Sequence, residues 1–600
     1  MSELIFNNLY LAILLPLWIF LIIMCGRFFA VYVQKKIIYF LTVLSSFLGI
    51  IICSLNLFHY TKPIEQTINF IKVNDFTISL GLYTDKTALI IALTLFIISF
   101  FVQLFSISYM KDEKKNYRFY AFLNFFNFSM SGLIFSPNLF QFYIFWELIG
   151  VVSYLLIGFD YNSENKSNAS KKVFLTNRIG DTALLSSIIL ISYFMYNYGN
   201  IKTLAELSFT NIGIITAILG AYASPAIFNL ICIMFIIAAA IKSAQFPFYT
   251  WLQDAMEAKL PVSALLHSAT LVAAGFYLLI RILPILQSEQ FIMILLTSIG
   301  ITTAIICSIL ASIETNPKKV LAYSTSANFG LMFWAVGLGQ IVASILFFIA
   351  HAFTKSLLFL CVNNKSKADL ILYVFGGLSI CGILFAGISS KEILYAALNN
   401  KFIFCAISIL TAFYITRLGL ILYNQNLKEK INYIQLICEF GLIITNFCLY
   451  VIVRKFFDYN ISLPFWFAAT GIIFALILRK HLTIFYKTPR ILEKIYYNFF
   501  PKLYESIANN LKCFDEKVLG NYKYTINASK FCVKTVNFIE NNVMLESVLT
   551  ITYIFKKISE QNFKLQKRNV QIYNAYAFII VTIIITLLII GYTLIINQLN

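Results

Sequence analysis

Runs of about 20 apolar residues recur along this sequence, separated by short polar segments. A run of this length crosses the hydrocarbon core of a bilayer as an α-helix, because each helical residue advances the chain by about 1.5 Å. A soluble fold has no interior for so many runs, since 60% of the 600 residues are hydrophobic and the mean hydropathy is +0.80. The sequence therefore predicts an all-α membrane protein that crosses the bilayer many times.

The number of runs predicts about 16 transmembrane helices. They cover residues 8–26, 36–58, 86–109, 119–136, 138–159, 172–197, 227–256, 262–282, 290–313, 319–338, 341–362, 370–396, 403–423, 433–453, 462–479 and 575–597. A shorter run at 213–223 is expected to lie in a loop. The first run lacks a basic segment before it, so we expect a membrane span and not a signal peptide.

Basic residues are concentrated in the loops that follow odd-numbered runs, among them Lys111–Arg118, Lys166–Lys172 and Lys365–Lys367. Loops rich in Lys and Arg remain on the cytoplasmic or matrix side of a membrane. We therefore predict that these loops face that side and that both termini lie opposite. The same distribution accounts for the net charge of +19 without a nucleic-acid partner, because the basic residues form no single patch.

The patterns of a cofactor site are missing from the sequence. The 11 cysteines are scattered singly, without a C-x-x-C pair, and neither a glycine-rich phosphate-binding motif nor H-E-x-x-H occurs. We therefore expect no metal, redox or nucleotide site in this chain.

Ionisable side chains inside apolar runs are costly and usually functional. Each ionisable side chain inside the apolar runs of this sequence also has a structural explanation, such as an ion pair, a packed histidine or a lysine that extends to the membrane interface. Their recurrence on successive runs favours a proton relay, because a movable carboxylate can switch a buried lysine between its charged and neutral forms. These residues are Glu147, Lys242, His267, Lys391, Glu392, and the pair His351 and Lys355, whose spacing of four puts them on one helix face.

Two prolines, Pro247 and Pro261, interrupt the helical pattern after Lys242. Broken helices at membrane depth occur only where protein or a water-filled cavity satisfies the freed backbone groups. Lys242 and Lys391 fall in the seventh and twelfth runs, five apart, which predicts two inverted five-helix repeats.

Residues after 480 contain amphipathic stretches and no span until the last run. We expect a long amphipathic helix there, lying along the membrane surface. The predicted organisation is N-terminal helices 1–3 (1–118), a first repeat (119–282), a second repeat (283–425), helices 14 and 15 (426–480), the lateral helix region (481–574) and a C-terminal anchor (575–600).

Several motifs resemble those of one family. They include FWELIGVVSYLLIGF, KKVFLTNRIGD, KSAQFPFYTWLQDAMEAKLPVSALLHSATLVAAG, NPKKVLAYSTSANFG and HAFTKSLLFL. In this order they are similar to the antiporter-like subunits of respiratory NADH:quinone oxidoreductase (complex I), called subunit L in bacteria and subunit 5 in mitochondria. The resemblance implies a proton-translocating membrane-arm subunit, with NADH, FMN, iron–sulfur clusters and quinone bound by partner subunits. It also implies a bacterial plasma membrane or mitochondrial inner membrane, of which we favour the bacterial one.

The resemblance also implies roles for individual residues. It assigns Glu147 and Lys242 as the coupled pair of the first half, with Asp181 as a further acidic partner of Lys242. It assigns His267 as the link toward the middle of the protein, and His351 and Lys355 as the continuation of that path. Lys391 with Glu392 would form the exit, and Lys319 would be a basic residue of the second repeat. The expected partners are other membrane-arm subunits, lipid and protons.

The sequence departs from the family at several positions. Gln253 stands where a proline is usual, Ala258-Lys259-Leu260 replaces Gly-Pro-Thr, and Phe347 replaces a histidine one turn before His351. The interval of 36 positions between Lys355 and Lys391 is shorter than in family members. Two alternatives therefore remain open: the large subunit of an Mrp-type cation/proton antiporter, and a paralogue that keeps the scaffold without pumping.

Overall fold

The computed structural model describes residues 8–28, 34–73, 76–113, 115–199, 207–362, 366–424, 432–457 and 462–478, and isolated positions 502, 505, 506 and 509. All the described ranges belong to one unit, which ends at Tyr486. Apart from those isolated positions, the predicted lateral helix and C-terminal anchor lie outside the described residues.

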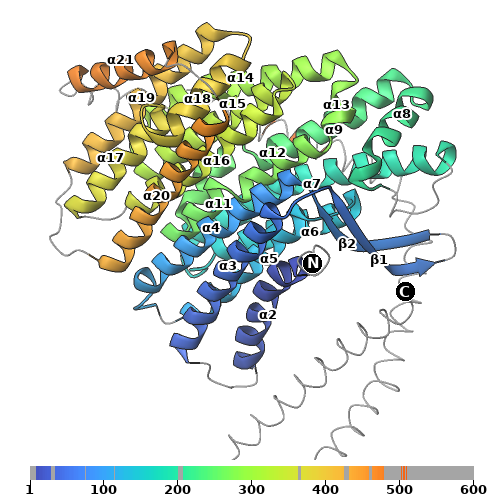
Figure 1. The fold of residues 1–600 in the computed structure, drawn as a ribbon, viewed down its shortest axis with the longest axis horizontal. Coiled ribbons are helices and arrows are strands. Elements are labelled where there is room, and N and C mark those ends of the chain that lie inside the picture. Colours follow the sequence, from blue (N-terminus) through green and yellow to red (C-terminus); the bar gives the residue numbers. More distant parts are fainter. Residues whose placement is uncertain are drawn as a thin grey trace, which may run out of the picture. The chain divides into compact units, whose positions relative to one another are not determined.

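Helices make up nearly all of this unit, from α2 in blue to α21 in orange (Figure 1). Within the described ranges, 12 helical segments are long and apolar enough to cross a membrane. The predicted all-α membrane fold is confirmed, whereas the number of 16 spans remains a prediction. The longer helices are α2 (Leu9–Phe28), α3 (Lys35–Phe58), α4 (Lys86–Tyr109), α5 (Asn116–Ile134), α6 (Leu139–Ile157), α7 (Glu164–Tyr198), α9 (Pro225–Lys242), α14 (Gln290–Ile313), α15 (Pro317–Gly337), α16 (Ile341–Cys361), α17 (Lys367–Cys381), α18 (Phe385–Ala397), α19 (Lys401–Tyr423), α20 (Tyr433–Phe456) and α21 (Leu463–Ile477).

Three predicted spans are interrupted in the structure. The seventh was expected to reach residue 256 but ends at Lys242, and the short helix α10 (Thr250–Asp254) follows it. The eighth divides into α11 (Leu260–Ser268) and α12 (Leu271–Arg281), and the twelfth divides into α17 and α18. A hydropathy pattern measures whether a run can enter lipid, and it does not detect these changes in backbone direction.

The interruptions have local physical causes. Ala244 adopts a left-handed conformation with φ 51°, and Pro247 offers no amide to continue the helix. After α11 the Thr270 hydroxyl donates to the carbonyl of Leu265 at 2.7 Å, satisfying a backbone group that the break exposes. Between α17 and α18, Gly382 has φ 84°, which glycine adopts without steric cost.

One short helix was expected to be a loop. Residues 213–223 form most of α8 (Ile212–Tyr222), which begins after a 3₁₀ turn, Phe209–Asn211, and ends before Ser224. The run is too short to span a bilayer, but its length does not prevent a helix from forming.

A two-stranded antiparallel hairpin was not predicted. It consists of β1 (Ile64–Val73) and β2 (Phe76–Thr84). The Gln141 side chain on α6 fastens it, accepting from the Gly81 amide at 2.8 Å and donating to the Gly81 carbonyl at 2.9 Å. The signal in the sequence is the β-branched and aromatic segment FTISLGLYT, which is too short to appear among membrane runs.

Charged residues from the loops that follow odd-numbered runs meet on one face. The Lys259 ammonium lies 3.0 Å from carboxylate oxygens of both Glu113 and Asp160, and Lys166 pairs with Asp160 at 2.7 Å. These residues come from the loops after the third, fifth and seventh runs, as the predicted alternation requires. The compartment that they face remains a prediction. Lys259 occupies the place of the family's proline, and these two ion pairs explain what a lysine does there.

We expect Lys259→Met to lower the free energy of unfolding by about 1 kcal/mol or less, because the pairs that it removes are partly exposed. Burial alone would raise the pKa of Asp160, but hydrogen bonds from Lys166 and Lys259 outweigh burial and lower it. A lowered carboxyl pKa stabilises the fold above the unfolded value, near 4, and this stabilisation is lost as the pH falls through the lower folded value. The variant should therefore unfold at a lower temperature than the parent at pH 7, and the difference should vanish in acid. Thermal unfolding between pH 3 and pH 8 checks this, and an unchanged difference throughout would contradict it.

Candidate functional site

Lys242 ends α9 deep inside the protein, with 1% of its surface exposed. Its ammonium donates to the main-chain oxygen of Trp146 on α6 at 3.3 Å and pairs with Asp181 on α7 at 3.5 Å. It also lies 4.9 Å from the centroid of the Trp146 ring, a cation–π distance. Gly150 on α6 lies beside the ammonium, and a β-carbon there would be in ordinary van der Waals contact with it at 3.5 Å.

Asp181 is the buried carboxylate of this site. The indole nitrogen of Trp146 donates to its Oδ1 at 2.8 Å, and the same oxygen faces Lys242. A buried charge is tolerable only when it is paired and hydrogen-bonded, and both conditions hold here. The Trp146 bond therefore orients the Asp181 carboxylate toward Lys242, and the role of Asp181 as a partner in proton transfer remains a prediction.

Glu147 is engaged by a different cation. Its Oε2 lies 2.6 Å from Arg178 on α7, and its Oε1 accepts from the Tyr143 hydroxyl at 2.7 Å. The predicted direct pair of Glu147 with Lys242 is therefore replaced by two adjacent ion pairs. The cause is helical geometry, because Glu147 follows Trp146 by one residue and projects about 100° further around α6.

Arg178 and Tyr143 are site residues that the sequence analysis missed. Arg178 lies in the NRIGD motif, three positions before Asp181, a spacing that places both on the same side of a helix. With this spacing, α7 presents Arg178 to Glu147 and Asp181 to Lys242. The predicted roles in proton transfer remain predictions.

His267 lies on α11 just before the break that separates it from α12, and it is fully buried. Its ring centroid is 6.3 Å from that of Phe359 on α16. Because His351, Lys355 and Phe359 are four residues apart in sequence, they share one face of α16. His267 therefore lies against the stripe of α16 that carries the other two predicted relay residues.

The two buried histidines have free ring nitrogens. Neither nitrogen of His267 or of His351 has a hydrogen-bond partner among the described residues. Each ring can therefore accept or release a proton without breaking an existing hydrogen bond. Phe347, one turn before His351, is buried on the same helix and offers no such group.

Two further lysines are buried and bonded to main-chain oxygens. Lys355 donates to the carbonyl of Leu321 on α15 at 3.0 Å, and Lys391 donates to the carbonyl of Cys381 at 3.3 Å. A β-carbon on Gly382 would lie 2.6 Å from the Lys391 side chain, so only a glycine leaves that lysine its space. The ammonium groups of Lys355 and Lys391 thus each donate a hydrogen bond to a backbone carbonyl, whereas the ammonium group of Lys242 pairs with a carboxylate.

Of the remaining predicted residues, Glu392 is buried next to Lys391, whereas Lys319 lies apart from this set. Glu392, on α18, accepts a hydrogen bond from the Ser462 hydroxyl before α21. Lys319 lies in the first turn of α15, where Asn316 caps the helix, and it is partly exposed. The structure therefore does not bring Lys319 into the buried group, because the N-terminal end of α15 reaches the surface.

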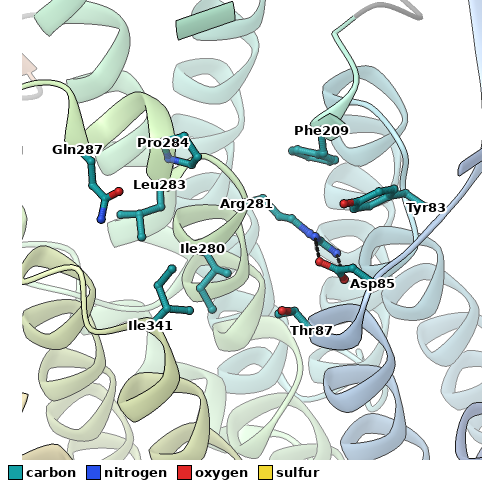
Figure 2. Close-up of a pocket in the computed structure, with 10 residues that line it drawn as sticks. All are labelled: Tyr83, Asp85, Thr87, Phe209, Ile280, Arg281, Leu283, Pro284, Gln287 and Ile341. Carbon is teal, nitrogen blue, oxygen red and sulfur yellow. Dashed lines mark hydrogen bonds and ion pairs between the residues drawn. The ribbon is translucent and has the colours of Figure 1, made fainter. Parts of the chain in front are cut away.

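A cavity of about 240 Å³ opens where α4 begins and α12 ends. Figure 2 shows Arg281 in its wall, paired with Asp85, with Tyr83 and Phe209 beside them. The pair has two contacts, of 2.7 and 3.0 Å, and Arg281 also donates to the Tyr277 hydroxyl at 2.8 Å. Asp85 in addition accepts from the amide of Ala88 and so caps α4. One carboxylate thus fixes the start of α4 to the end of α12.

We expect Arg281→Met to destabilise the protein by about 3 kcal/mol, because it leaves the largely buried Asp85 without its cation. The variant should accumulate to a lower level in the membrane and unfold at a lower temperature. Lys36→Met, which removes an exposed cation at the start of α3, is the matched control. Equal unfolding temperatures for the two variants in thermal melts would contradict this account.

Metal ligands do not cluster in the described part of the chain: no group of three or more His, Cys, Asp or Glu there could hold a metal ion. The chemistry that this arrangement supports is proton binding and release at buried Lys and His side chains, with the Asp181 carboxylate beside Lys242.

Comparisons with known proteins match two parts of this chain to families of membrane subunits. Residues 136–376 match the family described as NADH:quinone oxidoreductase/Mrp antiporter, transmembrane region. Residues 70–120 match the family described as NADH-ubiquinone oxidoreductase (complex I), chain 5 N-terminus. These two stretches contain Asp85, Glu147, Lys242 and both buried histidines.

Similar proteins include chloroplast NAD(P)H-quinone oxidoreductase subunit 5. The Marchantia polymorpha protein is 34% identical over 423 residues, covering 64% of this chain and 59% of its own length. The Fagopyrum esculentum protein is 39% identical over 315 residues, which cover 52% of this chain and 40% of the Fagopyrum protein. The aligned region thus spans less than two thirds of the length of these relatives.

Solved structures share the fold. A chain of the Mrp complex from Dietzia sp. superposes with a TM-score of 0.68 at 20% identity, covering 89% of this chain and 63% of that one. A chain of the archaeal membrane-bound sulfane sulfur reductase superposes with a TM-score of 0.65 at 20% identity. The superposition covers 78% of this chain and 97% of the reductase chain. Over residues 70–120 and 136–376 the chain is therefore similar to antiporter-like membrane subunits of NADH:quinone oxidoreductases and Mrp antiporters, and it shares their fold.

Proposed function

We propose that this chain translocates protons as a membrane-arm subunit of an NADH:quinone oxidoreductase. The observation that carries the proposal is the buried pair of Lys242 and Asp181 at the end of a helix that breaks inside the membrane region. The names of the relatives support the quinone oxidoreductase assignment. The two predicted repeats, residues 119–282 and 283–425, are the first and second halves of this proposal.

In the proposed mechanism, Lys242 binds a proton while Asp181 faces it. Two unit charges about 4 Å apart attract each other by about 4 kcal/mol at an effective dielectric constant near 20. Moving the carboxylate away weakens the hold of the lysine on its proton. Glu147 and Arg178 lie next to this pair on the same two helices, so a change in one pair alters the field at the other.

The proton then moves toward the second half. His267 receives it and passes it to the face of α16 that carries His351 and Lys355. Lys391, with Glu392, forms the exit on α18. The driving energy reaches this chain as a change in structure or electric field from neighbouring subunits, which bind NADH, FMN, iron–sulfur clusters and quinone in this proposal.

The membrane is an energy-converting one in this proposal. The proposed location is the bacterial plasma membrane or the mitochondrial inner membrane. The relatives described above are chloroplast proteins, so they give no support to the expected bacterial preference. Residues 481–574 are proposed to run along the membrane surface and to contact neighbouring subunits.

Purification of the tagged full-length chain from its native membrane tests the assignment. We expect it to co-purify with quinone-reducing subunits and to carry NADH:quinone oxidoreductase activity. Co-purification with small antiporter subunits and no such activity would contradict the proposal and support an Mrp-type antiporter. Isolation of a quinone-reducing complex whose proton translocation persists without this chain would support the non-pumping paralogue.

A further inference from the structure

The helix break after Lys242, residues 243–249, is held to the first half of the fold by side-chain hydrogen bonds across the break and from its first residue. The Trp251 indole donates to the carbonyl of Ile241 at 2.8 Å, across the break. The Ser243 hydroxyl donates to the carbonyl of Val272 on α12 at 2.7 Å. The break therefore keeps a defined shape beside Lys242.

The same segment is fastened to the second half by two more hydrogen bonds. The Gln245 side-chain amide donates to the carbonyl of Ser326 on α15 at 3.4 Å. The amide of Phe246 donates to the Thr303 hydroxyl on α14 at 3.0 Å. Helices α14 and α15 pack side by side along their length (Figure 1). The break after Lys242 thus contacts both the first repeat, through α12, and the second repeat, through α14 and α15.

Helix α15 also carries the acceptor of the second buried lysine. Lys355 donates to the carbonyl of Leu321, five residues before Ser326 on the same helix. Every residue of α15 from Val320 to Gly337 is buried. A close-packed helix of this kind moves as a unit and not by bending locally. A shift at Ser326 therefore reaches Leu321 and the Lys355 ammonium.

Gln245 has the features of a positioning residue. It is fully buried, and its amide nitrogen makes a second bond, to the Ser243 carbonyl at 2.8 Å. Its Oε1 atom has no hydrogen-bond partner among the described residues. A buried carbonyl without a partner is unfavourable, so packing alone would favour an apolar side chain of this size.

We propose that Gln245 couples Lys242 to Lys355 through α15. When Lys242 releases its proton and leaves Asp181, the segment that follows it moves, and Gln245 transmits the movement to Ser326. The carbonyl of Leu321 then changes its distance to Lys355. This inference rests on the proposed function, because it concerns the order of proton release at the two lysines.

Gln245→Leu in the complete complex tests the coupling. We expect quinone reduction to remain within about twofold of the parent rate, while the number of protons translocated per electron pair falls by about half, because Lys242 no longer controls the second lysine. The matched control is Asn328→Leu, which also removes a buried amide on α15. The Asn328 amide bonds to the Ser324 carbonyl within its own helix at 2.6 Å, so this variant should keep the parent ratio.

A pH profile separates coupling from a structural role. In the parent background, Lys242→Met should shift the pH at which residual proton translocation is half-maximal. In the Gln245→Leu background, Lys242→Met should cause no shift. A purely structural Gln245 would lower the amount of assembled complex and leave both the ratio and the shift unchanged, which would overturn the inference.

Two further measurements keep the test decisive. If Gln245→Leu prevents assembly, Gln245→Met, which is closer in shape, takes its place with the same expectations. If Lys242→Met and Lys355→Met both keep the parent ratio, the proposed function fails. If both abolish translocation and the Gln245 variants keep the parent ratio, only the coupling inference fails.

Discussion

Lys242→Met is expected to lower proton translocation by about tenfold or more, while the chain still inserts and assembles. The attraction between the Lys242 and Asp181 charges is about 4 kcal/mol at an effective dielectric constant near 20. A free-energy change of about 1.4 kcal/mol changes an equilibrium constant by about a factor of ten. Methionine has a similar length and no charge, so the variant removes the proton carrier and keeps the volume. Translocation in vesicles that contain the assembled complex measures the effect.

The control for this variant is again Lys36→Met, which removes an exposed lysine far from the buried pair in sequence. We expect it to translocate protons at the parent rate. Parent-like translocation by Lys242→Met would show that the buried pair is only a structural contact between α7 and α9. Asp181 would then serve to hold two helices together.

The second large effect is expected for Lys355→Met. This change removes a fully buried lysine from α16 and one of the donors to the Leu321 carbonyl, which still accepts from the Thr325 hydroxyl. Proton transfer along the face that carries His351 should stop, because the next buried lysine, Lys391, is on a different helix. We expect translocation to fall by about tenfold or more at an unchanged amount of assembled complex, since a carrier in series limits the whole path.

The measurement for Lys355 is again translocation in vesicles, now with Lys401→Met as the control. Lys401 is an exposed lysine at the start of α19, and its ammonium lies over the ring of Tyr395, 5.4 Å from its centroid. If both variants translocate equally well, the second half has no carrier at Lys355. The path would then have to leave the protein before α16.

The sequence was sufficient to predict much of the first half. A lysine at the end of an apolar run, followed by Pro247, predicts both a buried cation and a helix break, and the structure contains both. The alternation of basic loops also predicts that Lys259 and Asp160 lie on one face, where they form an ion pair. These features depend on local patterns that hydropathy and charge describe directly.

Other features depend on relations that no local pattern contains. Whether Glu147 or Asp181 faces Lys242 depends on the rotation of α6 about its axis, which differs by 100° between neighbouring residues. Arg281 and Asp85 are 196 positions apart, and only the fold brings them together. Breaks such as the one at Thr270 depend on which side chain replaces a missing backbone hydrogen bond, and a hydropathy average does not register this.

The most direct test of the central claim is proton translocation per electron pair in vesicles that contain the complex with Lys242→Arg. Arginine keeps the positive charge and the pairing with Asp181 but does not release its proton in proteins. The account predicts that this variant assembles like the parent and translocates as poorly as Lys242→Met. A Lys242→Arg variant that translocates protons at the parent ratio would contradict the role of Lys242 as a proton carrier.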